Sequence, residues 1–143
     1  MDSTGSPRIN LPAPYPLHTD TMQQVVVKQP GGVEELAFGS APLPQPAPHE
    51  VRIRVAAAGV NRADVAQRQG RYPVPAGASP VLGLEVSGQV DAVGRDVHGL
   101  APGDAVCSLT AGGGYAQFVC VPAAHCLPVP RGYTLVQGRL TEV

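Results

Sequence analysis

Residues 56–94, AAAGVNRADVAQRQGRYPVPAGASPVLGLEVSGQVDAVG, decide the fold of this chain. A strand is expected to enter this stretch, because apolar and polar side chains alternate over residues 50–58. A short helix is expected over residues 61–69, and a loop rich in proline and glycine follows it. A second long strand is expected over residues 81–93. Any reaction site of this chain is expected to lie within this strand–helix–loop–strand stretch.

The residues at both ends of the short helix define its length. Asn61 suits the N-cap position, and Asp64 would be the third helical residue, as in a capping box with Asp in place of Glu. Gly70 would end the helix, because glycine adopts the left-handed backbone of a C-terminal cap without strain. The last helical residue is therefore expected to be near Gln69.

The flanking sequence predicts short strands separated by turns. Further strands are expected over residues 25–27, 36–38, 105–109 and 115–121. Residues 41–48 carry proline at every second position, which predicts an extended surface connector. Many short strands with turn signals between them predict an all-β barrel or sandwich.

The composition indicates one ordinary domain. The chain has 143 residues, of which 43% are hydrophobic, and this is enough to bury a core. Its net charge of −1 argues against nucleic acid or a membrane surface as a partner. The 3 cysteines contain no CxxC pair, which favours the reducing cytoplasm over a disulfide framework. Residues 1–21 are rich in proline and small polar residues, and they predict a disordered leader.

Four segments, in this order and spacing, resemble one protein family. They are AAAGVNRAD (56–64), GLEVSGQVDAVGRDV (83–97), PGDAV (102–106) and GGGYAQFVCVPA (112–123). Together they resemble the catalytic domain of the medium-chain dehydrogenase/reductases, over about residues 22–136. The resemblance implies a mainly β fold, namely a GroES-like irregular β-barrel with one or two short helices.

Within that family the chain resembles the zinc-independent quinone oxidoreductases, in particular their p53-inducible type. The zinc enzymes carry a cysteine at the position of Asn61 and a histidine at the position of Leu84, and neither residue here is an ordinary zinc ligand. The resemblance implies cytoplasmic, zinc-free, NADPH-dependent reduction of a quinone or enone by hydride transfer. It also implies that the full-length parent is a homodimer with a small-molecule substrate, and with neither nucleic acid nor membrane as a partner.

The resemblance also implies roles for four residues. Asn61 would lie in the active-site cleft beside the nicotinamide, and Tyr72 would line the substrate pocket. Glu85 would be a structural carboxylate behind the former metal position, and Asp64 a structural residue near the site. The residues themselves leave simpler alternatives open. Asn61 can be a purely structural helix cap, and a loop tyrosine such as Tyr72 often packs against its neighbours without contacting a substrate.

The part of the family that holds the nucleotide is expected to be missing. Residues 137–143 would be the start of a link to an absent Rossmann domain, and the glycines at 112–114 lead into a strand rather than into a helix. We therefore expect this chain alone to be incapable of hydride transfer. The alternative is a stand-alone GroES-like binding or accessory module without catalysis, and a truncated gene fragment is a third possibility.

Overall fold

The computed structural model describes residues 20–138, so most of the expected leader and most of the expected link lie outside the described residues. Between those bounds the chain is mainly β, as predicted, with strands in two sheets and one α-helix. Strands β1 (Thr21–Val27) and β2 (Leu36–Pro42) form a hairpin. The other elements are β3 (Glu50–Ala58), α1 (Arg62–Arg68), β4 (Glu85–Val93), β5 (Ala105–Leu109), β6 (Phe118–Pro122) and β7 (Cys126–Pro128), with 3-10 turns at Val33–Glu35 and Ala123–His125.

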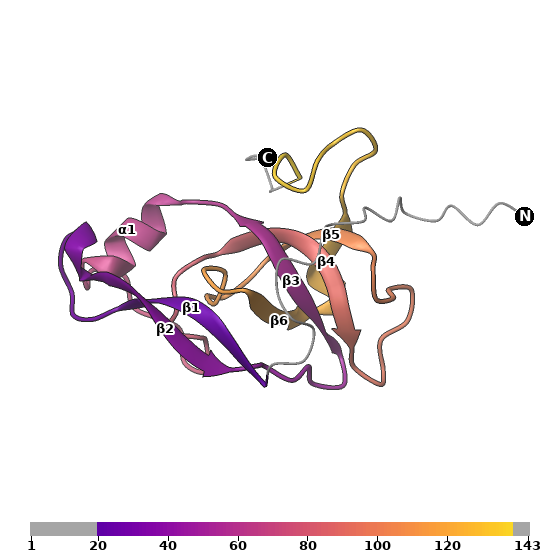
Figure 1. Cartoon of the computed structure of the whole chain (residues 1–143), viewed down its shortest axis with the longest axis horizontal. Coiled ribbons are helices and arrows are strands. Elements are labelled where there is room, and N and C mark those ends of the chain that lie inside the picture. Colours follow the sequence, from indigo (N-terminus) through magenta and orange to yellow (C-terminus); the bar gives the residue numbers. More distant parts are fainter. Residues whose placement is uncertain (1–19, 139–143) are drawn as a thin grey trace, which may run out of the picture.

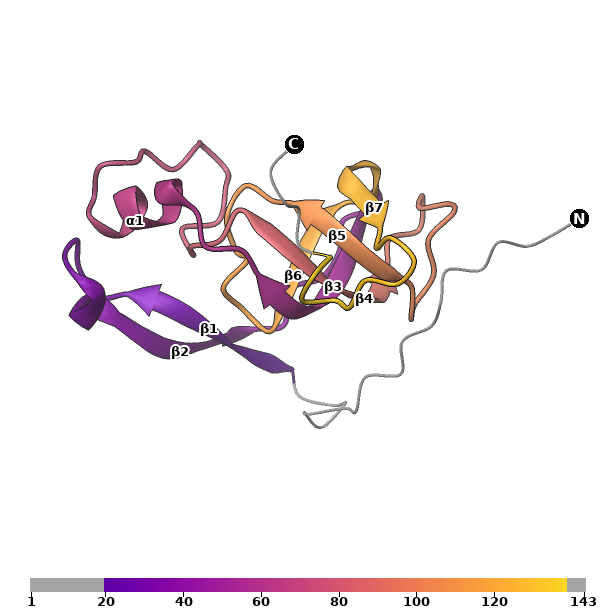
Figure 2. The same ribbon diagram turned by 90° about the horizontal axis from the view of Figure 1, so that it is seen from above.

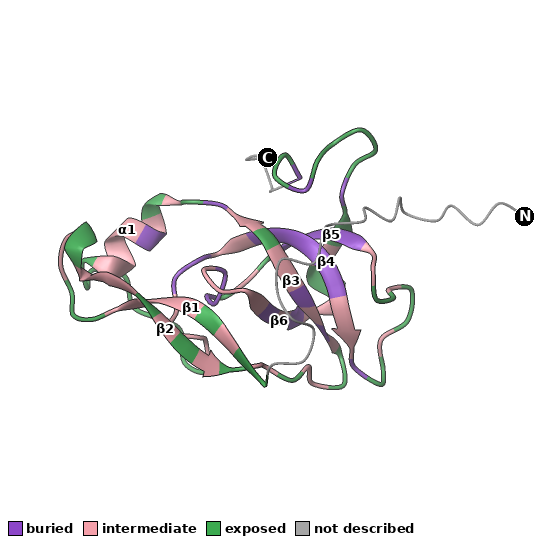
Figure 3. Ribbon diagram, in the orientation of Figure 1, coloured by how far each residue is buried: buried purple, intermediate pink, exposed green. Residues whose placement is uncertain are grey.

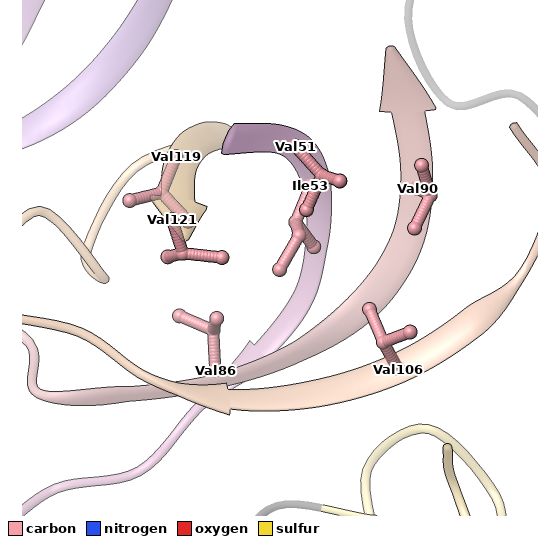
Figure 4. Packing of buried hydrophobic residues seen from close by; sticks show 7 residues of the cluster. All are labelled: Val51, Ile53, Val86, Val90, Val106, Val119 and Val121. Carbon is pink, nitrogen blue, oxygen red and sulfur yellow. The ribbon is translucent and has the colours of Figure 1, made fainter. Parts of the chain in front are cut away.

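The larger sheet has the antiparallel order β6-β3-β4-β5-β7, and it curls as Figure 1 shows. Alternation along β3 buries Val51 and Ile53 completely, as expected for a strand with one face against a core. The cluster inside the curl is built almost wholly from valine, which packs well on pleated strands. Figure 4 shows these side chains pointing toward one another from β3, β4, β5 and β6: Val51, Ile53, Val86, Val90, Val106, Val119 and Val121.

The central strand β4 is buried on both faces, as the purple band in Figure 3 shows. Its polar residues Ser87 and Gln89 are only 0% and 8% exposed. The Ser87 hydroxyl donates to the carbonyl of Leu135, and the Gln89 side-chain oxygen accepts from the Arg54 guanidinium at 2.8 Å. The C-terminal segment therefore covers Ser87, which lies on the face of β4 that alternation alone leaves open to solvent.

Two predicted strands begin later in the structure than in the sequence analysis. The strand expected over 81–93 starts only at Glu85, because Gly83 has a φ of +105°, outside the extended region. The strand expected over 115–121 likewise starts at Phe118. Residues 81–84 and 110–115 instead hydrogen-bond to each other, with the N–H groups of Gly113 and Tyr115 donating to the carbonyls of Val81 and Leu82.

The hairpin is tied to the rest of the fold at two places. At one, the Val25 N–H donates to the Tyr115 carbonyl and the Gln117 N–H donates to the Gln23 carbonyl. At the other, the Gly31 N–H donates to the Arg68 carbonyl at 3.0 Å, and the Arg68 guanidinium returns a bond to the Gly31 carbonyl at 3.1 Å. Accordingly α1 and the hairpin lie at the same end of the molecule in both views (Figures 1 and 2). Over residues 20–138, no helix combines the length and apolar character needed to span a membrane.

Candidate functional site

Helix α1 begins as its sequence predicts. Asn61 is the N-cap, with an extended backbone at φ −118° and ψ 159°, and the Asp64 carboxylate accepts the Asn61 N–H at 2.8 Å. Gly70 has the predicted positive φ of +76° and follows the helix end. Asp64 thus stabilises one of the N–H groups that an α-helix leaves without an internal partner.

Asp64 also joins three segments that are far apart in the sequence. It is only 3% exposed, and its Oδ1 accepts the Gly83 N–H at 3.1 Å. Its Oδ2 accepts the Tyr115 hydroxyl at 3.1 Å. We call Asp64, Asn61, Gly83 and Tyr115 the Asp64 hub. The hub fixes the start of α1 against the chain that enters β4.

Tyr115 keeps its proton in this arrangement. Burial raises the pKa of Tyr115, and the neighbouring Asp64 carboxylate raises it further. The phenol therefore remains a hydrogen-bond donor to Asp64 at any physiological pH. Its role here is to hold the hub together.

A hollow of about 310 Å³ adjoins α1 at Gln67. We call it the Tyr72 hollow; it is lined by Gln67, Tyr72, Val74, Pro75, Ser79, Leu84, Leu109, Thr110 and Ala111. Its walls come from the C-terminal part of α1, the loop over residues 72–79, the entry to β4 and the end of β5. Most of the lining is apolar, with a few polar side chains, as is usual for small-molecule sites.

Three of the four polar side chains of the Tyr72 hollow form hydrogen bonds within the described chain, and the fourth does not. Gln67 donates its amide to the Pro80 carbonyl at 3.0 Å, and Thr110 donates its hydroxyl to the Gly112 carbonyl at 2.7 Å. The Ser79 hydroxyl oxygen accepts the Val81 N–H at 3.2 Å. Tyr72, which is 37% exposed, has no hydrogen-bond partner among residues 20–138. Its hydroxyl is therefore available to a ligand.

The predicted site residues are only partly brought together. Tyr72 and Leu84 both line the hollow, whereas Asn61 does not contribute to its lining. The carboxylate of Glu85 lies directly against the buried Gly59, and the Gly59 N–H donates to the Glu85 carbonyl at 3.1 Å. The catalytic and coenzyme-contact roles of Asn61 and Tyr72, and the structural role of Glu85, stay predictions.

The described residues supply no metal cluster, and Gly113 and Gly114 form no phosphate cradle. Within residues 20–138 no three His, Cys, Asp or Glu side chains gather as a metal site would require. The N–H groups of Gly113 and Gly114 donate to the Val81 and Gly83 carbonyls at 2.8 and 3.1 Å, so they are not free to bind phosphate.

The sequence analysis assigned no site role to Tyr115 or Leu109. Tyr115 was assigned to a strand and Leu109 to the end of another, yet the first binds Asp64 and the second lines the hollow. A usable signal existed for Tyr115, since a buried carboxylate such as Asp64 needs donors and a tyrosine beside a glycine run is a candidate. No comparable signal marked Leu109. A second hollow of about 360 Å³ contains none of Asn61, Tyr72 and Leu84.

Comparison with known proteins places the chain in a family. The alcohol dehydrogenase GroES-like domain matches residues 47–131, more than half of the chain. Among relatives, the erythronolide synthase EryA2 of Saccharopolyspora erythraea is 40% identical over 135 residues, which is 93% of this chain and 4% of the synthase. The chain spans between 3% and 27% of the length of the curated relatives compared with it.

Solved structures agree with this assignment. A quinone oxidoreductase from Coxiella burnetii has a TM-score of 0.74 at 25% identity, over 82% of this chain and 40% of that one. A mycobacterial protein in complex with NADPH has a TM-score of 0.71 at 37% identity, over 80% of this chain and 35% of that one.

Proposed function

Because this chain belongs to the alcohol dehydrogenase GroES-like domain family of medium-chain dehydrogenase/reductase oxidoreductases, we propose that it forms the substrate side of a zinc-independent, NADPH-dependent quinone or enone reductase. The observation that carries the proposal is Tyr72, which lines a mainly apolar hollow and has no hydrogen-bond partner within residues 20–138. The likeness to a quinone oxidoreductase and to an NADPH complex supports both the reaction and the coenzyme. The reaction belongs to the cytoplasm, in keeping with unpaired cysteines.

The residues of the hollow suit the reduction of a carbonyl compound. NADPH supplies a hydride when bound, and a quinone that takes up this hydride and one proton becomes a hydroquinone. The Tyr72 hydroxyl donates a hydrogen bond to the substrate oxygen that gains negative charge. The apolar walls formed by Val74, Leu84 and Leu109 exclude water and so strengthen that hydrogen bond.

Asn61 has a second proposed task on the nicotinamide side. Its backbone is held at the N-cap by Asp64 and does not depend on the substrate. A side-chain amide at this position offers both a donor and an acceptor to a carboxamide ring substituent. The phosphates and the adenosine require a nucleotide-binding domain, and we propose that the parent protein supplies it.

The test is carried out on the full product of the reading frame that encodes this chain. We expect quinone-dependent oxidation of NADPH, followed by nicotinamide absorbance, with no requirement for added zinc. Tyr72→Phe should lower kcat by about 10- to 100-fold, because one hydrogen bond to the developing charge is lost. Tyr133→Phe, at a tyrosine 54% exposed and outside the hollow, is the matched control.

Two results would contradict the proposal. Turnover that is unchanged in Tyr72→Phe would remove this residue from the reaction. A reading frame that ends at residue 143 and a product that neither oxidises NADPH nor binds it would favour the stand-alone accessory module. The 143-residue chain by itself is expected to give no turnover above background.

A further inference from the structure

The Tyr72 hollow lacks any charged side chain in its lining. Four of its nine lining residues carry polar side chains, and three of these are already hydrogen-bonded within the chain. Arg71 precedes Tyr72 in sequence but is exposed and is not part of the lining. A ligand in this hollow therefore meets one side chain without a hydrogen bond and otherwise mostly carbon.

This arrangement makes a charged ligand costly to bind. An ionised group that leaves water must find a counter-charge or several donors, and the lining offers no counter-charge. An uncharged carbonyl oxygen loses less hydration free energy when it leaves water, and one hydrogen bond from a tyrosine hydroxyl compensates for this loss. The volume of about 310 Å³ is at the small end for ligand sites and suits one or two rings.

Leu109 lies at the border between the Tyr72 hollow and the solvent. It lies at the end of β5, lines the hollow, and is nevertheless 57% exposed. A long side chain at this position reaches both the hollow and the solvent, so it can carry a charge without being buried. Leucine there leaves the rim apolar.

We propose that the Tyr72 hollow selects uncharged, mainly apolar carbonyl compounds with one hydrogen-bonded oxygen, and that Leu109 sets this selectivity against anionic ligands. The inference rests on the proposed function only in taking the hollow as the substrate site. It goes further by excluding carboxylate-bearing enones and ketones as substrates. It also adds Leu109 as a specificity-determining residue.

The test measures binding to the full 143-residue chain, without coenzyme. The ligands are 1-tetralone and its 6-carboxylate, two ketones of the same skeleton that do not alkylate cysteine. Amide chemical shifts are followed during titration, so that the residues that respond are identified. We expect shifts at Tyr72 and Leu109, with the neutral ketone bound about tenfold more tightly than the carboxylate, which corresponds to about 1.4 kcal/mol.

Leu109→Arg should reverse the preference. It places a guanidinium at the rim and should tighten carboxylate binding about tenfold relative to the binding of tetralone. Leu127→Arg is the matched control, since Leu127 is 54% exposed on β7 and outside the hollow. Tyr72→Phe should remove the preference for 1-tetralone over tetralin, which lacks the oxygen. Both leucines are exposed, so these variants are expected to fold.

Three outcomes would overturn the inference. The first is equal affinity of the two ketones, with shifts at Tyr72 and Leu109. The second is a Leu109→Arg variant that still prefers the neutral ketone as strongly as the wild type does. The third is a wild type that prefers the carboxylate and loses this preference in Arg71→Gln, which would assign ligand charge recognition to Arg71. Different results would reject the inference and the proposed function. Selective ketone binding without NADPH oxidation by the full gene product would reject the reductase alone, whereas turnover of both ketones at equal kcat/KM would reject the selectivity alone.

Discussion

The Asp64 hub and the Tyr72 hollow adjoin the same short helix, but they differ in the hydrogen bonding of their central polar side chains. In the hub a carboxylate that is 3% exposed accepts hydrogen bonds from Asn61, Gly83 and Tyr115. In the hollow the Tyr72 hydroxyl has no partner within the described chain. Satisfied buried groups stabilise a fold, while an available donor in a hollow serves a ligand. The comparison separates the scaffold from the site.

The largest effect is expected from removing the centre of the hub. Asp64→Ala leaves three donors without their acceptor, of which the Gly83 N–H is buried and the other two are partly buried, and we expect the free energy of unfolding to fall by about 3–5 kcal/mol. Asp91→Ala is the matched control, because Asp91 forms one partly buried 2.7 Å ion pair with Arg52, and its loss should cost less, about 1 kcal/mol. Urea denaturation of both variants measures the difference. Equal losses would show that the hub is no more than a surface pair.

A second test breaks the hub through its backbone. Gly83→Ala places a Cβ 2.6 Å from the Cα of Gly114 at a φ of +105°, so both strain and overlap arise. We expect a loss of about 3 kcal/mol in the free energy of unfolding. At Gly77 the φ is +79° and no atom lies within 4 Å of the added Cβ, so Gly77→Ala isolates the backbone strain at about 1 kcal/mol. If the two variants unfold at the same denaturant concentration, close packing at Gly83 is unimportant.

The smallest effect concerns the pH dependence of the hub. Because burial and Asp64 raise the pKa of Tyr115 above 10.0, the unfolded chain loses this proton first as the pH rises. The stabilisation from the Tyr115 phenol is therefore complete below about pH 10 and is lost as the pH rises through the folded-state pKa. Tyr115→Phe should reduce the free energy of unfolding by about 1–2 kcal/mol at pH 7.

The same variant sharpens the comparison at high pH. The stability gap between wild type and Tyr115→Phe should narrow above about pH 10. Denaturation curves from pH 7 to 11 measure the gap. A gap that is constant over this range would argue against a protonated Tyr115 as the donor to Asp64.

Sequence reasoning predicted the helix well because the signals that end a helix are local. Asn61, Asp64 and Gly70 act within one or two turns of each other, and the structure has a helix with these caps. Strand β3 was predicted to the residue for a similar reason, since alternation is a property of neighbours along the chain. The strand over 81–93 was predicted to start too early, because its first residues pair with a segment about thirty positions away.

The candidate site was predictable only in part. Tyr72 came from the family resemblance, and the hollow that it lines is consistent with that prediction without testing the role. The place of Leu109 in the lining of the hollow could not be predicted, because its position relative to Tyr72 depends on how β5 lies beside β4. The burial of Ser87 was also not foreseen, since its hydroxyl donates to the Leu135 carbonyl, in the C-terminal part of the chain.

The sequence by itself determined the mainly β class, the short capped helix and the membership of the oxidoreductase family, because these follow from local periodicity, caps and motifs. The tertiary structure alone decided that Asp64 joins three segments and that Tyr72 shares a hollow with Leu84 and Leu109. The physical reason is that hydrogen bonds and pocket walls form between residues that chain folding brings together, and no local pattern encodes which distant side chain arrives.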